Sequence, residues 1–164
     1  MEQVEFVRVR TGFEGSFSVD RVGMSGGLAL LWRDKDTATV LGFSQNHIDV
    51  IVSLPGKPQW RLTCFYGYPE RARRQHSWSL LRQLKDNSDL PWVILGDFND
   101  LACHSEKRGP HPHPNSLILS FTDALHDCNL LDLGMQGNRF TWERGRGTDN
   151  WVEERLDRAV ATLD

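Results

Sequence analysis

The chain has 164 residues, of which 39% are hydrophobic and 25% are charged, enough for one folded domain with a substantial core. No apolar stretch approaches 20 residues, and charged residues interrupt the start of the chain, which excludes a membrane-spanning helix and a signal peptide. We therefore expect a soluble intracellular protein, in the nucleus or the cytoplasm. The formal net charge of −3 argues against a dedicated nucleic-acid-binding protein, for which a basic domain is usual.

Smaller groups of residues refine these limits. Three widely spaced cysteines, Cys64, Cys103 and Cys128, favour neither a disulfide framework nor a zinc site. Two groups of arginines could still neutralise phosphates locally, although solvated charges on a helix or a hairpin are the favoured explanation of each group. These groups are Arg71, Arg73 and Arg74, and Arg139, Arg144 and Arg146.

The first half of the chain predicts one helix followed by strands. Residues 2–11 are expected to be helical, with the helix ending at Gly12. Apolar segments separated by Gly, Pro, Asp and Asn predict strands at residues 17–20, 28–32, 38–43, 48–54 and 61–66. The turn at residues 55–58 predicts that the last two form a hairpin.

The second half alternates helices and strands. Trp78, Leu81 and Leu84 give residues 73–84 a helical period, and Ser116 is placed to cap a helix over residues 116–126. A strand is expected before Asp97 and a loop over residues 100–115. Further strands are predicted at residues 130–133, and at 140–143 paired with 156–161 through the polar segment 144–150. This order predicts an α+β fold, a two-layer β-sandwich flanked by helices, in a single partial domain over residues 1–164.

The most informative segment is Gly96-Asp97-Phe98-Asn99, which follows the apolar residues 92–95. Side chains two residues apart on a strand share a face, so Asp97 and Asn99 could both point at one phosphate. That is the geometry of a phosphoesterase. The alternative is an ordinary Gly-Asp turn, in which the aspartate bonds only neighbouring backbone amides.

Three further segments carry side chains suited to a phosphate site. Tyr66 ends a predicted strand, where its hydroxyl could reach a phosphate oxygen or simply lie at the rim of the core. Thr141 lies between two aromatic residues. Around Leu156, which should face the core, Arg155 and Asp157 share the opposite face. Taken singly, each segment fits a structural role as well.

In order, these segments resemble the endonuclease/exonuclease/phosphatase superfamily, which includes deoxyribonuclease I and the apurinic-site repair endonucleases. The sequence looks most similar to the endonuclease domain of plant non-LTR (LINE-type) retrotransposons. The resemblance rests on GGLALLW at residues 26–32, FYGYP at 65–69, PWVILGDFN at 91–99, FTW at 140–142 and RLDRA at 155–159. It implies a deoxyribonuclease I-like fold and a DNA-nicking phosphodiesterase that uses Mg²⁺ or Mn²⁺.

The resemblance also implies roles for individual residues. Asp97 matches the residue that orients or deprotonates the attacking water, and Asn99 matches the amide that binds the scissile phosphate. Tyr66 matches a tyrosine beside the phosphate, and Asp157 matches the aspartate that orients the active-site histidine. Thr141 falls where the family often has a hydroxyl near the phosphate, and Arg139 beside it is the candidate to neutralise phosphate charge.

Two motifs of the family do not occur in this sequence: a Glu-Thr-Lys whose glutamate binds the metal, and a Ser-Asp-His whose histidine contacts the phosphate. Catalytic groups that act as a unit fail together, so we expect an incomplete domain that is weakly active or inactive and self-associates through exposed sheet edges. The metal ligands are therefore unknown. The histidines do not replace these motifs: His111 and His113 are expected in a solvated loop, and His104 could border the cleft.

Three functions remain open at this stage. The first is a retrotransposon-derived endonuclease-like domain that acts on DNA. The second is a non-catalytic remnant or binding module, which the missing motifs favour. The third is a phosphatase of the same superfamily that acts on inositol phosphates or sphingolipids, because such enzymes share the Gly-Asp-Phe-Asn segment.

Overall fold

The computed structural model describes residues 2–21 and 27–163. These residues form two compact units. The first comprises residues 1–66 and 90–95, and the second comprises residues 67–89 and 96–164. Within the described residues, no helix is both long enough and apolar enough to cross a membrane.

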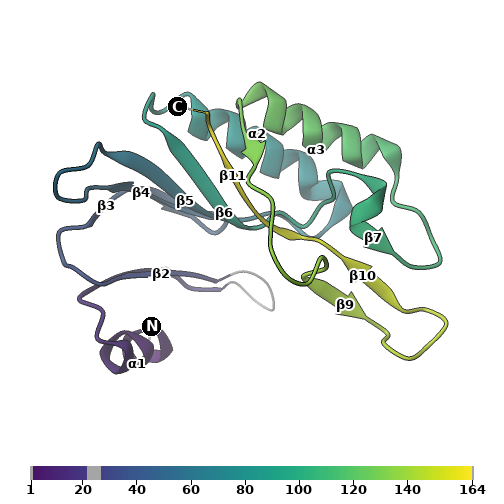
Figure 1. The fold of residues 1–164 in the computed structure, drawn as a ribbon, viewed down its shortest axis with the longest axis horizontal. Coiled ribbons are helices and arrows are strands. Elements are labelled where there is room, and N and C mark those ends of the chain that lie inside the picture. The colour runs from purple at the N-terminus through teal and green to yellow at the C-terminus, as the bar shows by residue number, and fades with distance from the viewer. Residues whose placement is uncertain (1, 22–26, 164) are drawn as a thin grey trace. The chain divides into compact units, whose positions relative to one another are not determined.

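The first unit consists of a helix and strands that form two sheets (Figure 1). Its elements are α1 (Glu2–Thr11), β1 (Gly15–Val19), β2 (Leu28–Trp32), β3 (Ala38–Ser44), β4 (His47–Val52), β5 (Trp60–Tyr66) and most of β6 (Trp92–Asp97). β1 pairs with β2, while β3, β4 and β5 form a second sheet in which β6 lies beside β5. The helix and all five strands predicted before residue 67 are confirmed to within a few residues.

The two sheets of the first unit pack on an apolar core. Ile48 pairs with Cys64 and Val50 pairs with Leu62, so alternate residues of β4 and β5 turn the same face toward the core. Val19 from β1 is buried in this cluster, and Leu30 from β2 packs against it. This is the layered arrangement that the sequence predicts.

The opposite face of β4 and β5 carries a buried polar network. The Arg61 guanidinium donates to both carboxylate oxygens of Asp49, with its closest contact at 2.7 Å, and the Thr63 hydroxyl donates to Asp49 at 2.7 Å. Trp92 donates its indole N–H to Thr63 at 2.8 Å. Because each partner is satisfied by another, the charges are tolerated in the interior.

The second unit consists of two long helices and several short strands (Figure 1). Its elements are η1 (Arg71–Arg73), α2 (Arg74–Lys85), the end of β6, η2 (His104–Glu106), β7 (Lys107–Arg108), α3 (Asn115–Asp127), β8 (Leu131–Asp132), β9 (Trp142–Arg144), β10 (Val152–Glu154) and β11 (Asp157–Ala161). β7, β10 and β9 form one sheet, and β11 pairs with β8.

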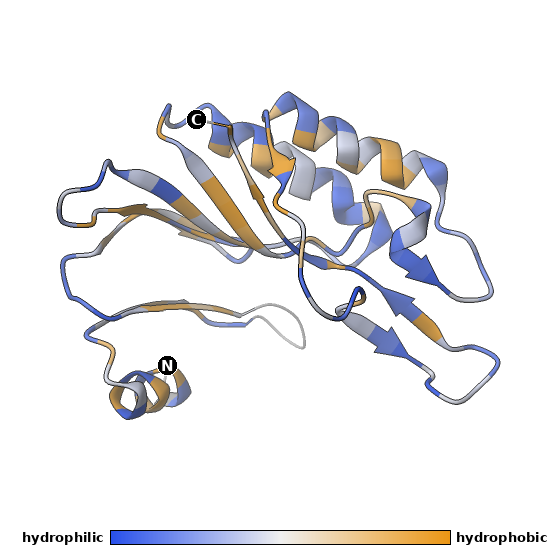
Figure 2. Cartoon of the chain, viewed as in Figure 1, coloured by the Kyte–Doolittle hydropathy of each residue, from blue (hydrophilic) through white to orange (hydrophobic). Residues whose placement is uncertain are grey.

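Helices α2 and α3 lie side by side and bury aromatic side chains. Trp78 of α2 stacks on Phe121 of α3 with ring centroids 4.7 Å apart, and Phe98 packs against Phe121 at 5.5 Å. Figure 2 shows hydrophobic and hydrophilic bands alternating along α3, as expected for an amphipathic helix with one buried face. These contacts hold the segment after β6 against the helices.

Three predictions about the secondary structure of this unit are wrong. The loop predicted over residues 100–115 contains η2 and β7. Ser116 does not cap α3: the helix begins at Asn115 after Pro114, so Ser116 lies inside its first turn. Residues 140–143 do not pair with 156–161. Instead β9 pairs with β10, because Gly145 and Gly147 at positive φ close a hairpin earlier in the chain, and β11 is left to pair with β8. Gly26 of the GGLALLW motif lies outside the described residues.

Candidate functional site

The turn that follows β6 is built by the Gly96-Asp97-Phe98-Asn99 segment. Gly96 has φ 144°, and Asn99 has φ 53°, a left-handed conformation that asparagine tolerates better than most residues. The backbone N–H of Asn99 donates to Asp97 Oδ1 at 2.8 Å. β6 ends at Asp97, so the strand alternation invoked for Asn99 is wrong: the turn, not the pleat, sets the direction of its side chain.

Gly67 fixes the position of this turn from the other side. Its N–H donates to the carbonyl of Asp97 at 2.7 Å, and its own carbonyl accepts from Asn99 Nδ2 at 3.0 Å. A Cβ atom at Gly67 would lie 2.4 Å from the Phe98 carbonyl oxygen, so no other residue fits without displacing the turn. The Asn99 side chain is therefore buried with one of its two amide protons committed to Gly67.

Asp157 lies close enough to Asp97 to influence its ionisation. Burial, opposed by the hydrogen bond from the Asn99 backbone, and then the charge of Asp157 raise the pKa of Asp97 above its ordinary value. The positive charge of Arg74 acts in the opposite direction. The structure thus gathers two carboxylates and one guanidinium at the turn after β6.

Thr141 links this turn to the start of β11. Its hydroxyl oxygen accepts the backbone N–H groups of Leu156 and Asp157, both at 3.0 Å. The Leu156 carbonyl accepts the N–H of Phe98 at 2.9 Å. Four of the predicted site residues, Asp97, Asn99, Thr141 and Asp157, are therefore brought together by the second unit.

The other two predicted residues are Tyr66 and Arg139. Tyr66 ends β5 in the first unit, where its backbone N–H and carbonyl bond the carbonyl and side chain of Asn46 at 2.8 and 2.7 Å. Arg139 is exposed, with its guanidinium 5.9 Å from the centre of the Phe140 ring. Leu156 is buried, as predicted.

The sequence analysis does not predict a buried cluster of charged side chains directly after Asn99. Asp100 is fully buried, and its Oδ1 accepts from His113 Nε2 at 2.7 Å and lies 3.0 Å from Arg74 NH1. The expectation of a solvated His113 is wrong, because the loop folds back and buries the ring against Asp100; His111 is exposed. The available signal was an acidic residue immediately after the Gly-Asp-Phe-Asn segment.

A second charged cluster surrounds the segment that carries Asp157. Glu106 and Asp132 each contact both Arg155 and Arg158 within 3.2 Å. Burial raises the pKa values of both acids, but hydrogen bonds and charge from the arginines outweigh it and hold both pKa values below their ordinary range. The repeated charges of the RLDR sequence were the signal for this cluster.

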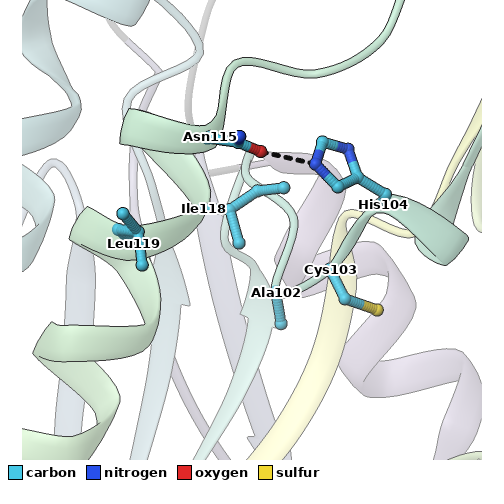
Figure 3. A pocket seen from close by; sticks show the side chains of 6 residues that line it. All are labelled: Ala102, Cys103, His104, Asn115, Ile118 and Leu119. Atoms are coloured by element: carbon cyan, nitrogen blue, oxygen red, sulfur yellow. Dashed lines mark hydrogen bonds between the residues drawn. The ribbon is translucent and has the colours of Figure 1, made fainter.

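The loop between Asn99 and α3 also forms two cavities. One, of about 320 Å³, is lined by Ala102, Cys103, His104, Asn115, Ile118 and Leu119 (Figure 3). Within it, His104 Nε2 donates to Asn115 Oδ1 at 2.5 Å. The other, of about 360 Å³, is lined by His104, Lys107, Gly109, His111, Pro112 and His113. His104 thus lines both cavities and bonds α3.

A divalent metal ion of the Mg²⁺ type takes several oxygen ligands in octahedral geometry. Within residues 2–21 and 27–163, no three His, Cys, Asp or Glu side chains are grouped so that they could hold a metal ion. Asp97 and Asp157 supply only two carboxylates. The described residues therefore do not fit a complete metal site.

Solved structures show the same fold with low sequence identity. The endonuclease domain of TRAS1, a telomere-specific non-LTR retrotransposon, matches with a TM-score of 0.62 and 13% identity over 99% of this chain and 79% of that one. The 3′ phosphatase NExo from Neisseria, bound to product DNA hairpin, matches with a TM-score of 0.66 and 17% identity over 99% and 70%. Truncated TDP2 from Caenorhabditis elegans matches with a TM-score of 0.57 and 14% identity over 96% of this chain and 65% of that one.

At these identities the likeness establishes the fold alone, a mixed α+β fold of the deoxyribonuclease I type, as predicted. No curated protein is similar enough in sequence to match the chain. The model of the Endonuclease/Exonuclease/phosphatase family matches residues 5–164. The chain therefore belongs to the endonuclease/exonuclease/phosphatase family.

Proposed function

We propose that the chain is a retrotransposon-derived endonuclease domain whose ancestral activity is the metal-dependent nicking of DNA. The family comprises metal-dependent nucleases and phosphatases. The observation that carries the proposal is the convergence of Asp97, Asn99, Thr141 and Asp157 at the turn after β6. The resemblance to plant LINE-type endonucleases in five ordered motifs supports the choice of DNA as substrate.

Asp97 is the proposed general base. A carboxylate whose pKa is raised by burial binds a proton more readily than an exposed aspartate. It would orient the attacking water and take its proton. The hydrogen bond from the Asn99 backbone fixes the Oδ1 atom of this carboxylate.

We assign the contacts with the phosphate to neutral and cationic hydrogen-bond donors. The Asn99 side chain donates one amide proton to Gly67 and also bonds Asp97, which places its amide at the proposed phosphate position. The Thr141 hydroxyl can still donate while its oxygen accepts two amides. Tyr66 and Arg139 are proposed as further phosphate contacts. Asp157 occupies the position that would orient the active-site histidine, which this sequence does not supply through a Ser-Asp-His motif.

The DNA backbone would meet exposed arginines of the second unit. Arg71, Arg73, Arg139, Arg144 and Arg146 are exposed and suited to phosphates. Arg74, in contrast, is nearly buried and faces Asp100, so we exclude it from this surface. Mg²⁺ or Mn²⁺ is the proposed cofactor, because the family generally depends on divalent metal ions.

The activity of this chain is proposed to be weak or absent, since its sequence contains neither the Glu-Thr-Lys nor the Ser-Asp-His motif. The same observation favours the second candidate, a non-catalytic remnant or binding module. A phosphatase acting on inositol phosphates or sphingolipids is a third candidate, supported only by the membership of phosphatases in the family.

A panel of substrates separates these candidates. Supercoiled plasmid, a 3′-phosphorylated oligonucleotide, an inositol polyphosphate and sphingomyelin would each be incubated with the chain and Mg²⁺ or Mn²⁺, with EDTA as the blank. We expect slow cleavage of plasmid alone. Release of phosphate or phosphocholine without nicking would show that the chain is a phosphatase and not an endonuclease. DNA binding without cleavage of any substrate would indicate a binding module.

A further inference from the structure

We propose that Glu106 is a positioning residue, which holds the two arginines on either side of Asp157 and thereby keeps the Asp157 segment against the turn that carries Asp97. The N–H of Phe98 in that turn donates to the carbonyl of Leu156 at 2.9 Å. The inference rests on the proposed function and adds a residue to it. Glu106 lies in η2, far from Asp157 in the sequence.

The Glu106 carboxylate is committed entirely to this segment and its own loop. Its Oε1 accepts from Arg155 at 2.9 Å and from Arg158 at 3.2 Å, and its Oε2 accepts from Arg158 at 2.8 Å. Oε2 also accepts the N–H of Ala102 at 2.7 Å. The side chain is only 7% exposed, so these bonds form where water competes weakly.

Asp132 completes a four-membered charge network. Its Oδ1 accepts from Arg155 at 2.8 Å and its Oδ2 accepts from Arg158 at 2.9 Å. Two acids thus balance two arginines, and the Arg158 side chain is fully buried. Each arginine is held by two acids, which restricts its rotation and the backbone that carries it.

The backbone of the same segment is fixed as well. Arg155 N–H donates to the Glu106 carbonyl at 3.0 Å, and the amides of Leu156 and Asp157 donate to Thr141. Asp157 itself is exposed, so we assign its placement to the anchoring of its neighbours.

A carboxylate is required at position 106. Glutamine would keep one acceptor oxygen but lose the charge, and Asp132 would be left as the carboxylate that bonds the buried guanidinium of Arg158. Removing one partner of a buried ion pair leaves a charge uncompensated, so the segment would loosen rather than merely lose one bond.

The test compares three variants of the full chain with the wild type by NMR. Glu106→Gln removes the anchor, and Asp157→Asn removes the charge that it is proposed to position. Glu154→Gln is the matched control, since Glu154 is a partly buried acid in the same unit that pairs with Lys107 at 2.5 Å. The two readouts are the carboxyl titration of Asp97 and amide hydrogen exchange along the chain, and neither requires catalysis.

We expect Glu106→Gln to lower the pKa of Asp97 in the same direction as Asp157→Asn, by about half as much, because the neighbouring negative charge moves away. Exchange at Leu156 and Asp157 should quicken by about tenfold or more while exchange in the first unit is unchanged. Glu154→Gln should do neither. If Glu106→Gln does not fold, Asp132→Asn loosens the same arginines from a more exposed position and takes its place.

The proposal is overturned if Glu106→Gln leaves the Asp97 titration at the wild-type value, or if exchange quickens equally in both units, which would mark a general loss of stability. These outcomes are independent of nicking. A chain that cuts no substrate but shows the expected titration and exchange would refute the endonuclease and retain the positioning role.

Discussion

The backbone N–H of Asn99 donates to Asp97 Oδ1 at 2.8 Å while Asn99 itself adopts a left-handed conformation with φ 53°. The bond turns the chain sharply at the end of β6 and presents both side chains in one short turn. Residues in such sparsely populated conformations are concentrated at functional sites, where the surrounding structure holds them in place. Gly67, which bonds both residues, supplies that support.

Replacing Gly67 by alanine should displace this turn. The new Cβ would lie 2.4 Å from the Phe98 carbonyl oxygen, a backbone atom that cannot move aside by rotation. We expect a loss of about 1–3 kcal/mol in unfolding free energy, measured by urea denaturation. Gly42→Ala is the control, because its Cβ would meet no atom within 4 Å. Equal effects of the two substitutions would argue against the close approach.

Replacing Asp97 by asparagine should stabilise the fold at neutral pH. The pKa of Asp97 is raised, so the folded state favours the protonated form: the stabilising contribution is complete below the ordinary carboxyl pKa and is lost as pH rises through the raised pKa. Asparagine resembles the protonated form at every pH. The Tm of Asp97→Asn should therefore exceed that of the wild type at pH 7 and converge with it at about pH 3. A lower Tm at pH 7 would contradict this reading.

Glu106 and Asp132 should destabilise the fold when they are protonated at acid pH, which is the opposite of the effect of Asp97. Their pKa values are lowered, so their contribution is present above the ordinary carboxyl pKa and lost as pH falls through the lowered values. We expect the Tm of the wild type to fall below about pH 4 and that of Asp132→Asn to fall less over the same range. If the Tm of both proteins fell equally with pH, Asp132 would not contribute to the acid sensitivity.

Asp49→Asn tests the polar network of the first unit. The substitution takes the anionic partner from the fully buried Arg61, and we expect a loss of about 3 kcal/mol or more. Glu5→Gln is the control, because it breaks an exposed pair with Arg8 and should leave the midpoint of urea unfolding unchanged. A small effect of Asp49→Asn would mean that water reaches Arg61.

The elements and motifs with local signals could be predicted from the sequence. Alternating apolar residues identified β2 and β5, and the helical period of Trp78, Leu81 and Leu84 identified α2. The order of the motifs identified the family. Neither conclusion required knowledge of contacts between distant residues.

Features that depend on distant contacts could not be predicted. His113 looks solvated in an extended Pro-rich segment, and only the folding back of the loop brings it to Asp100. The pairing of β9 with β10 depends on where a glycine-rich hairpin closes. The contacts of Glu106 with Arg155 and Arg158 span about 50 residues, so no local pattern reveals them.

The most direct test of the central claim is nicking of supercoiled plasmid by the wild-type chain and by Asp97→Asn, with Mg²⁺ or Mn²⁺ against EDTA, using proteins shown to be folded by their melting curves. We predict weak nicking that requires the metal and is lost in Asp97→Asn. Nicking that survives this substitution would remove Asp97 from the reaction. No nicking by the folded wild type would contradict a catalytic role for this chain and favour the non-catalytic remnant.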